Sequence, residues 1–349
     1  MNLELTRRDF LELAGGTGAV FATGLWTLDA MAQAKALLPE AERIVVTVVV
    51  DNLADATRPN YKIARRPGGG KTPLDSAMHA EHGLAYHVEV VVDGKSHAFL
   101  YDFGAQAQGV MRNLDLLGLD MRKVEAMALS HDHWDHEAAL PELLQAKAGE
   151  FGRGLPLYVG ERFFVGTYSK RPDGQIRNLS TVSREQLEST GIVKIVEVKA
   201  ATAIVPGAML TGPVRQVTDY EKIPQSFLTK RGEEFVPEDF IGEQSIVMNA
   251  KGKGLVLLTA CAHRGVVNIL KHVQQVTGVE KVHAVIGGLH LTNANQVVID
   301  RTVADLKAAR PDYIVPCHCS GHEAIGTVAR EMPEQFILNT AGTRYVFEA

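Results

Sequence analysis

The pattern of apolar residues in the first half of the chain predicts β-strands joined by short turns. Two β-branched runs, RIVVTVVVDN (43–52) and YHVEVVVDGKSHAFLYDFG (86–104), have the composition of strands and end in Asp, Asn or Gly. The second run contains Asp93–Gly94, a pair that favours a tight hairpin turn. Helical spacing follows over 110–117, and VEAMALS (124–130) predicts a further strand.

The C-terminal half alternates between strand and helix patterns. Strand-like segments, each running into reactive residues, lie at 254–263, 282–291 and 313–324. Helical patterns occupy the intervals 265–276 and 296–309. This alternation predicts an α/β architecture, and the sequence contains no internal repeat or low-complexity linker that would suggest a second domain.

The region between Gly152 and Gly242 is less regular. It contains several Pro, Gly and charged positions, which predict loops and short elements that cover one edge of the domain. We expect contacts with a small-molecule substrate in this region.

Composition narrows the range of partners. The 349 residues are 46% hydrophobic and 22% charged, with a net charge of −5, which is typical of a globular protein. No basic stripe is visible, which argues against a nucleic-acid partner. The 3 cysteines, Cys261, Cys317 and Cys319, are too few and too clustered for a disulfide framework, and all lie beside histidines.

The segment ALSHDHWDH (128–136) concentrates histidines and aspartates after a predicted strand. His131, His133 and Asp135 are spaced by two residues, so on an extended backbone they face one way, and His136 follows. Imidazoles with a carboxylate suit Zn²⁺, Fe²⁺ or Mn²⁺, and this set has enough ligands for two adjacent ions.

Further histidines follow three later strands, at positions 263, 290 and 318. Side chains placed directly after strands gather along one edge of a sheet. We therefore expect all four segments to meet at one metal site.

The motif LSHDHWDH resembles the metal motif of the metallo-β-lactamase superfamily, whose fold is a four-layered αββα sandwich. Within this superfamily, the chain resembles the branch of dihydropterin aminobenzene ribofuranosyl phosphate synthase. The resemblance lies in four blocks that occur in this order: YDFG, TACAHRGVVNIL, IGGLHL and PCHCSGHEA. The resemblance covers most of residues 35–349 and implies one domain of this fold.

The resemblance also implies a set of metal ligands. The third histidine of the first metal position in the superfamily follows the motif before the next strand, but this chain has no histidine from 137 to 262. We therefore assign His131, His133 and His263 to one metal. Asp135, His136 and His318 are assigned to the other.

The cysteines allow more than one interpretation. Cys261, in TAC, occupies the place of an aspartate that bridges the two metals in many superfamily members, so it is either a thiolate ligand or a small buried residue beneath the site. Cys317 and Cys319 flank His318 and on a strand would point away from it. We interpret both as packing residues.

Four other residues are candidates for supporting roles. His290, in GGLHL, matches a position where related phosphodiesterases carry a histidine that acts on substrate, and it is either a proton donor or a core histidine. Glu81 and His82 are candidate pocket residues or supports for ligands. Asp102 resembles a superfamily aspartate that orients the metal loop.

The preferred hypothesis is a hydrolase with two divalent ions, zinc in the first place and manganese or iron as alternatives. A metal-activated hydroxide would attack a phosphate ester, phosphodiester or lactone, with Asp135 and His290 as the catalytic residues. The alternatives are a transferase of the synthase type, a metal-binding or sensing protein without turnover, and an iron-loaded redox member of the superfamily.

The N-terminal segment TRRDFLELAGGTGAVFATGLWTLDAMAQA (6–34) resembles a twin-arginine (Tat) export signal, with Arg7 and Arg8 on the motif. Cleavage after Ala32 or Ala34 fits the spacing of small residues. The apolar stretch is too short for a stable membrane span. We expect export to the periplasm by the Tat translocase, with the alternative that 1–34 forms an amphipathic surface helix.

Overall fold

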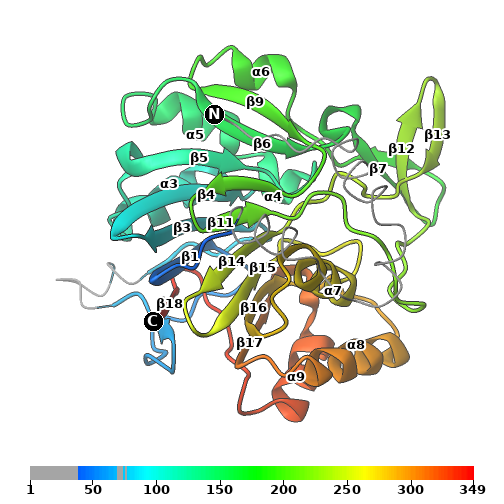
Figure 1. The fold of residues 1–349 in the computed structure, drawn as a ribbon. Coiled ribbons are helices and arrows are strands. Elements are labelled where there is room, and N and C mark those ends of the chain that lie inside the picture. Colours follow the sequence, from blue (N-terminus) through cyan, green and yellow to red (C-terminus); the bar gives the residue numbers. More distant parts are fainter. Residues whose placement is uncertain (1–37, 69–73, 75–76) are drawn as a thin grey trace, which may run out of the picture.

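The computed structural model describes residues 38–68, 74 and 77–349. The predicted signal segment (1–34) lies outside the described residues. Two large β-sheets and one small sheet account for the strands (Figure 1). The first large sheet has eight strands in the order β2 (Ala64–Arg65), β18 (Arg344–Glu348), β1 (Arg43–Val50), β3 (Ala85–Val92), β4 (Lys95–Phe103), β5 (Val124–Ala128), β6 (Leu155–Gly160) and β9 (Val193–Val198).

The second large sheet has six strands in the order β10 (Thr202–Val205), β11 (Ala208–Leu210), β14 (Ile246–Ala250), β15 (Gly254–Leu258), β16 (Val282–Gly288) and β17 (Tyr313–Cys317). The small sheet has the order β13 (Glu234–Pro237), β12 (Phe227–Arg231), β7 (Thr167–Lys170) and β8 (Ile176–Asn178). The α-helices are α3 (Ala107–Leu116), α4 (Trp134–Glu137), α5 (Leu140–Ala146), α6 (Arg184–Glu188), α7 (Val266–Thr277), α8 (Gln296–Ala308) and α9 (His322–Glu331).

The alternation of side chains along each strand creates the layers. In β15, Val256 and Leu258 face the apolar layer between the two large sheets, whereas Leu255 and Leu257 face the layer that contains α7. Helices α3 and α5 cover the outer face of the first sheet, and α7, α8 and α9 cover that of the second. This is the four-layered αββα sandwich that the family resemblance implies.

The predicted strands and helices outside 152–242 are confirmed. At the β3–β4 hairpin, Asp93 (φ +49°) and Gly94 (φ +71°) both adopt left-handed backbone, as the tight turn requires. In the second sheet, β15, β16 and β17 run parallel, and α7 and α8 connect them. Parallel strands place the segments that follow them at one edge of the sheet.

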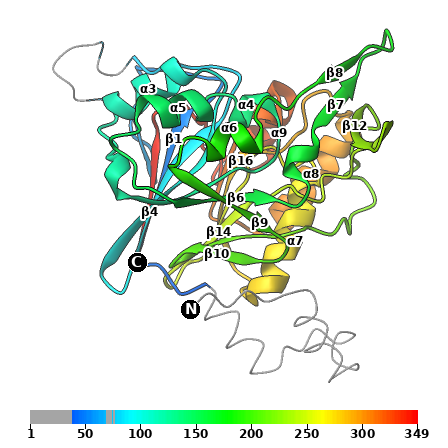
Figure 2. The same cartoon turned by 90° about the horizontal axis from the view of Figure 1, so that it is seen from above.

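The prediction of irregular structure over 152–242 was wrong in part. Strands β6 and β9 extend the first sheet, and β10 and β11 extend the second. These strands are short, and β6, β9 and β11 are held in the sheets by partners that are distant in the sequence. The small sheet, β7, β8, β12 and β13, forms an arm at the edge of the sandwich (Figure 2).

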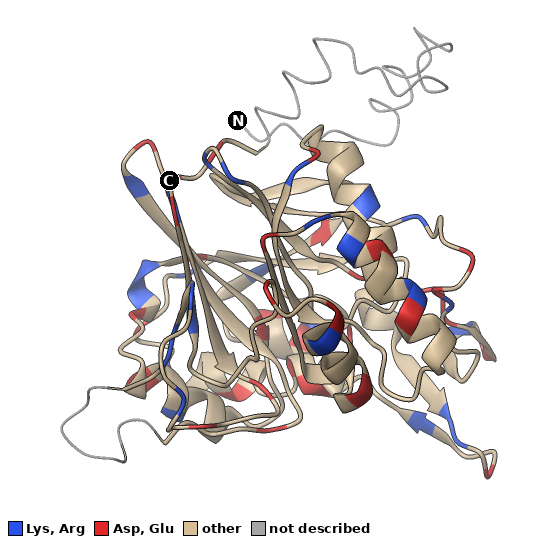
Figure 3. Cartoon of the chain, turned by 90° about the horizontal axis from the view of Figure 1, so that it is seen from below, with Lys and Arg blue, Asp and Glu red and all other residues tan. Residues whose placement is uncertain are grey.

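Charges are distributed over the described surface without segregation by sign. Basic and acidic positions are interspersed along the ribbon (Figure 3). Among the described residues, no helix is both long enough and apolar enough to cross a membrane.

Candidate metal centre

The four predicted segments meet at one edge of the sandwich. His131 to His136 follow β5, Cys261 to His263 follow β15, His290 follows β16, and His318 follows β17 directly. Groups of ligand atoms from these segments lie within 4.8 Å of one another. The geometry thus brings together residues that are up to 187 positions apart, from His131 to His318.

The first group contains His131, His133 and His263, the set assigned to one metal. All three are buried, and Nε2 of His131 lies 3.2 Å from Nε2 of His263. Burial and the neighbouring histidines lower the pKa of His131 and His263 well below its usual value, and burial lowers that of His133 to about 3. These imidazoles are therefore neutral, the form that binds a metal.

A hydrogen-bonded network fixes which nitrogens face the centre. The Ser130 hydroxyl donates to Asp102 Oδ2 (2.7 Å) and, as an acceptor, lies 2.8 Å from Nδ1 of His131. Nδ1 of His136 lies 2.7 Å from the same carboxylate oxygen. If both Nδ1 atoms donate, both Nε2 atoms carry lone pairs toward the cluster. Asp102 therefore has the geometry to orient two ligands, as metal sites require.

The second group joins Asp135 and His318 with His82. Oδ2 of Asp135 lies 3.3 Å from Nε2 of His318 and 3.7 Å from Nε2 of His136. Burial raises the pKa of Asp135, but the adjacent His136 and His318 outweigh it and hold that pKa well below its usual value. His82 is exposed and stacks on His318 at 4.9 Å between ring centroids.

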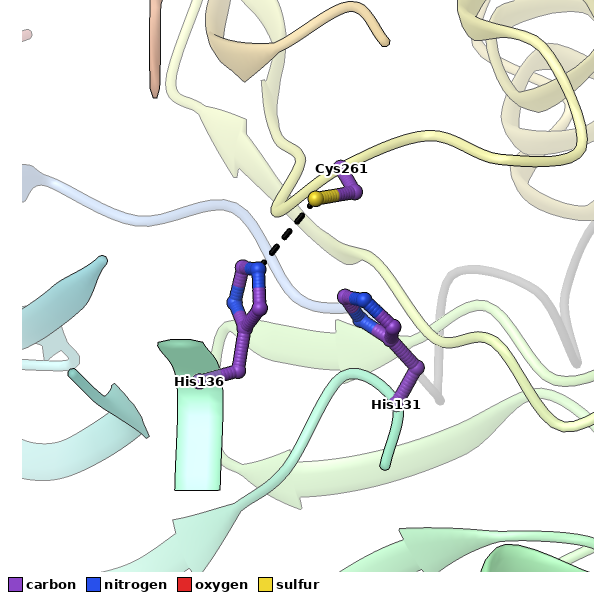
Figure 4. Close-up of side chains that lie close together, drawn as sticks. All are labelled: His131, His136 and Cys261. Atoms are coloured by element: carbon purple, nitrogen blue, oxygen red, sulfur yellow. Dashed lines mark hydrogen bonds between the residues drawn. The ribbon is translucent and has the colours of Figure 1, made fainter. Parts of the chain in front are cut away.

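His136 does not join this second group. Its Nε2 lies 3.2 Å from Sγ of Cys261, and the two group with His131 (Figure 4). Cys261 is buried and takes part in three of the five groups of ligand atoms in the described residues. The sulfur therefore lies at the middle of the cluster.

The expectation that Cys319 points away from His318 was wrong. Its Sγ lies within 4.8 Å of the ligand atoms of Cys261 and His318. The expected alternation fails because His318 has left-handed backbone (φ +51°) and begins the 3₁₀ turn η4 (His318–Ser320). Cys317, as expected, packs in the apolar layer between the sheets.

His290 lies at the edge of the cluster and is partly exposed. It groups with Cys261 and His263, and its ring centroid is 4.0 Å from that of His263. Burial lowers its pKa, but hydrogen bonding and charge at Cys319 outweigh this, so the pKa of His290 lies above its usual value. A protonated imidazole at this place has the chemistry of a proton donor.

Glu81 does not reach the cluster. Its carboxylate accepts from the backbone N–H groups of Ala105 (2.7 Å) and Gln106 (3.3 Å), and lies 3.0 Å from Nε2 of His79. It therefore holds the loop between β4 and α3, next to Asp102.

Two carboxylates that were not predicted from the sequence hold the metal-binding loops. Glu243 accepts from the N–H groups of His263 (2.7 Å) and Arg264 (2.9 Å). Asp51 accepts from the N–H of His318 (3.0 Å). Asp51 directly follows β1, so the rule that located the histidines would have found it, whereas Glu243 lies in a loop with no comparable signal.

Two side chains of the motif connect it to the arm. Asp132 accepts from the hydroxyls of Thr167 (2.8 Å) and Ser180 (2.7 Å), and Glu137 accepts from the N–H of Thr181. Phe227 of β12 and Phe240 cover the histidines, and Phe240 stacks on His263 at 4.0 Å between ring centroids. The region expected to contact substrate thus borders the centre.

The residues present fit a metal. Nε2 of His133, Nδ1 of His290 and both ring nitrogens of His318 are buried without hydrogen-bond partners among the described residues. Buried polar atoms are nearly always paired, so an orphaned group of imidazoles indicates a ligand set. Asp102, Ala262, His290 and His318 also have left-handed backbone, a strain that concentrates at functional sites.

The fold and this cluster define the class of protein: the chain has the metallo-β-lactamase fold. The crystal structure of Tm1679, a metal-dependent hydrolase of the β-lactamase superfamily, superimposes with a TM-score of 0.67 at 22% identity, covering 86% of this chain and 98% of that one.

A more specific relationship comes from sequence. The chain is 26% identical over 279 residues, covering 79% of this chain and 92% of the relative, to 7,8-dihydropterin-6-methyl-4-(β-D-ribofuranosyl)-aminobenzene-5′-phosphate synthase of Methanocaldococcus jannaschii. This is distant homology. No protein-family model matches the chain.

Proposed function

We propose that this protein is a dinuclear metal-dependent hydrolase that acts on a phosphate ester, a phosphodiester or a lactone. The proposal is supported mainly by the convergence of His131, His133 and His263. Nε2 of His131 lies 3.2 Å from Nε2 of His263, and Nε2 of His133 is buried without a hydrogen-bond partner among the described residues. Divalent ions bound here supply a Lewis acid and lower the pKa of a bound water to about 7.

The chain's own residues account for the remaining parts of the reaction. Asp102 and Ser130 fix the orientation of His131 and His136. Phe227 and Phe240 restrict water on the arm side of the centre. His290, partly exposed at the edge, is placed to donate a proton to the leaving group from one of its ring nitrogens.

The test is a screen of chromogenic phosphodiester, phosphomonoester and lactone substrates with the metal-loaded protein. We expect turnover of one class and a loss of about 10²–10⁴-fold in kcat for His290→Ala at unchanged metal content. His283→Ala, at the opposite end of β16, is the matched control and should retain activity. Full metal occupancy without turnover on any class would overturn the proposal and favour a metal-binding or sensing protein.

A second candidate is a transferase of the synthase type, which the relationship to the Methanocaldococcus jannaschii enzyme favours. Incubation with a dihydropterin and an aminobenzene ribofuranosyl phosphate, followed by mass spectrometry, distinguishes the two. A coupled product without hydrolysis of the chromogenic esters would favour the transferase.

We also propose export by the Tat translocase to the periplasm, on the strength of Arg7 and Arg8 in the N-terminal motif. Replacement of both by Lys should retain the protein in the cytoplasm, as measured by cell fractionation. Equal amounts of both proteins in the periplasm would contradict this route.

A further inference from the structure

The geometry points to a sulfur-ligated metal position: we infer that Cys261, His318 and Cys319 together hold one of the two metal ions. This inference rests on the proposed dinuclear centre and specifies the chemistry of its second position. It differs from the assignment based on resemblance, in which Asp135 and His136 accompany His318.

His318 is the residue that most requires a ligand. Its side chain has 0% exposure, and neither ring nitrogen has a hydrogen-bond partner among the described residues. Asp135 Oδ2 lies 3.3 Å from Nε2, an ion-pair contact without hydrogen-bond geometry. Nε2 has only this ion-pair contact and Nδ1 has no partner, so coordination of an ion would satisfy a buried nitrogen that the described residues leave unpaired.

Two thiols converge on this imidazole. Sγ of Cys261, Sγ of Cys319 and a ring nitrogen of His318 all lie within 4.8 Å of one another. In a tetrahedral zinc site, Zn–S and Zn–N distances of about 2.3 and 2.0 Å separate neighbouring ligand atoms by roughly 3.5–3.8 Å. The observed spread is therefore compatible with one ion held by these three atoms after small adjustments of side chains.

The backbone is built to bring Cys319 to the centre. The N–H of His318 donates to Asp51 (3.0 Å), and Asn52 Nδ2 donates to the carbonyl of His318 (2.9 Å). These bonds fix the left-handed turn that directs Cys319 inward while Cys317 stays in the core. Gly288 leaves the space, because a Cβ there would lie 2.7 Å from the Cys319 sulfur.

The sulfurs also have weaker partners. Cys261 lies 3.2 Å from Nε2 of His136 (Figure 4), and Cys319 donates to the carbonyl of Cys261 at 3.4 Å. A thiol is a weak donor, so replacing these contacts with metal bonds costs little. Neither contact involves His318, whereas an ion held by both sulfurs would also bind a ring nitrogen of His318.

The chemical consequence is metal selectivity. Thiolates are soft ligands that favour Zn²⁺ and the similar Co²⁺, whereas carboxylate and water ligands suit Mn²⁺ and Mg²⁺. The position should therefore discriminate against Mn²⁺ more strongly than a site made of Asp135, His136 and His318.

The test is absorption spectroscopy of the full-length protein loaded with Co²⁺. A thiolate bound to Co²⁺ gives an intense charge-transfer band in the near ultraviolet, separate from the weak visible bands of the metal itself. We expect this band in the wild type, a reduced band in Cys319→Ser, and none in Cys261→Ser/Cys319→Ser. Cys317→Ser, two residues from Cys319 but in the core, is the matched control and should retain the full band.

The inference is overturned if the wild type binds Co²⁺ without the band, or if Cys319→Ser leaves the band unchanged. If a variant fails to fold, X-ray absorption at the zinc edge of the wild-type protein tests sulfur ligation without any variant. Sulfur neighbours at about 2.3 Å are expected there, and a shell of nitrogen and oxygen alone refutes sulfur ligation.

The outcome for the hydrolase is independent of this result. A charge-transfer band in a protein that turns over no ester or lactone would support sulfur ligation and refute the hydrolase. Turnover by a protein whose metal has only nitrogen and oxygen neighbours would support the hydrolase and refute sulfur ligation. Failure to bind any metal would refute both the hydrolase and sulfur ligation.

Discussion

Asp102→Asn tests whether one carboxylate orients the metal-binding histidines. Oδ2 of Asp102 accepts from the Ser130 hydroxyl and lies 2.7 Å from Nδ1 of His136, while Oδ1 accepts from the Ser130 N–H at 2.7 Å. Asn has the same size and tolerates the left-handed backbone at this position (φ +57°). However, its NH₂ group faces at least one of these donors in either orientation of the amide.

The structure predicts the size of the effect. Loss of a partner that orients a ligand typically weakens metal binding about 10–100-fold, or about 1.4–2.7 kcal/mol. The assay is competition with a chromophoric chelator, with circular dichroism to show that the variant is folded. Asp312→Asn is the matched control, because Asp312 makes a similar contact with His283 Nδ1 (2.6 Å) at the opposite end of β16. A folded Asp102→Asn variant that binds metal as tightly as the wild type would refute the reasoning.

Three further predictions concern stability. Removal of metal by a chelator should lower the Tm measured by calorimetry. If the free ion had been at one hundred times Kd, the loss corresponds to about 2.7 kcal/mol of unfolding free energy. An unchanged Tm would argue against a bound metal in the native state. Burial, assisted by Arg344, lowers the pKa of His87 to about 4, so the unfolded chain binds more protons than the native state between pH 4 and 6.5. The unfolding free energy should therefore fall by up to about 3 kcal/mol as pH decreases from 6.5 to 4. Urea unfolding of the metal-free protein should show a smaller fall for His87→Leu than for the wild type. An equal fall in both proteins would show that His87 does not cause the pH dependence. Leu258→Ala, in the layer between the sheets, should cost about 2–5 kcal/mol in the same assay, and a cost below about 1 kcal/mol would contradict its close packing.

Much of the fold was predictable because the central strands carry their signal locally. The β-branched runs of β1, β3 and β4 and the Asp93–Gly94 turn need no information from elsewhere in the chain. Strand β6 was missed because LPLYVG is short and contains Pro and Gly, whereas VKIVEV of β9 has a β-branched pattern that was recognisable in the sequence. They become strands by parallel pairing with β5 and with each other.

The proximity of the histidine segments was predictable for a topological reason: parallel strands end at the same edge, so residues that follow them meet. The direction in which individual side chains point was not predictable. Cys319 faces the centre only because His318 adopts a left-handed conformation, and alternation along an ideal strand predicts the opposite. Glu243 holds the loop of His263 across 20 positions of sequence, a contact that tertiary structure alone creates.

The most direct test of the central claim is elemental analysis of the purified protein, with His133→Ala/His263→Ala alongside the wild type. We expect about two divalent ions per wild-type chain and about one in the double variant, which lacks two of the three ligands at one position. About one ion or fewer per wild-type chain, after incubation with zinc and removal of the excess, would contradict the dinuclear centre.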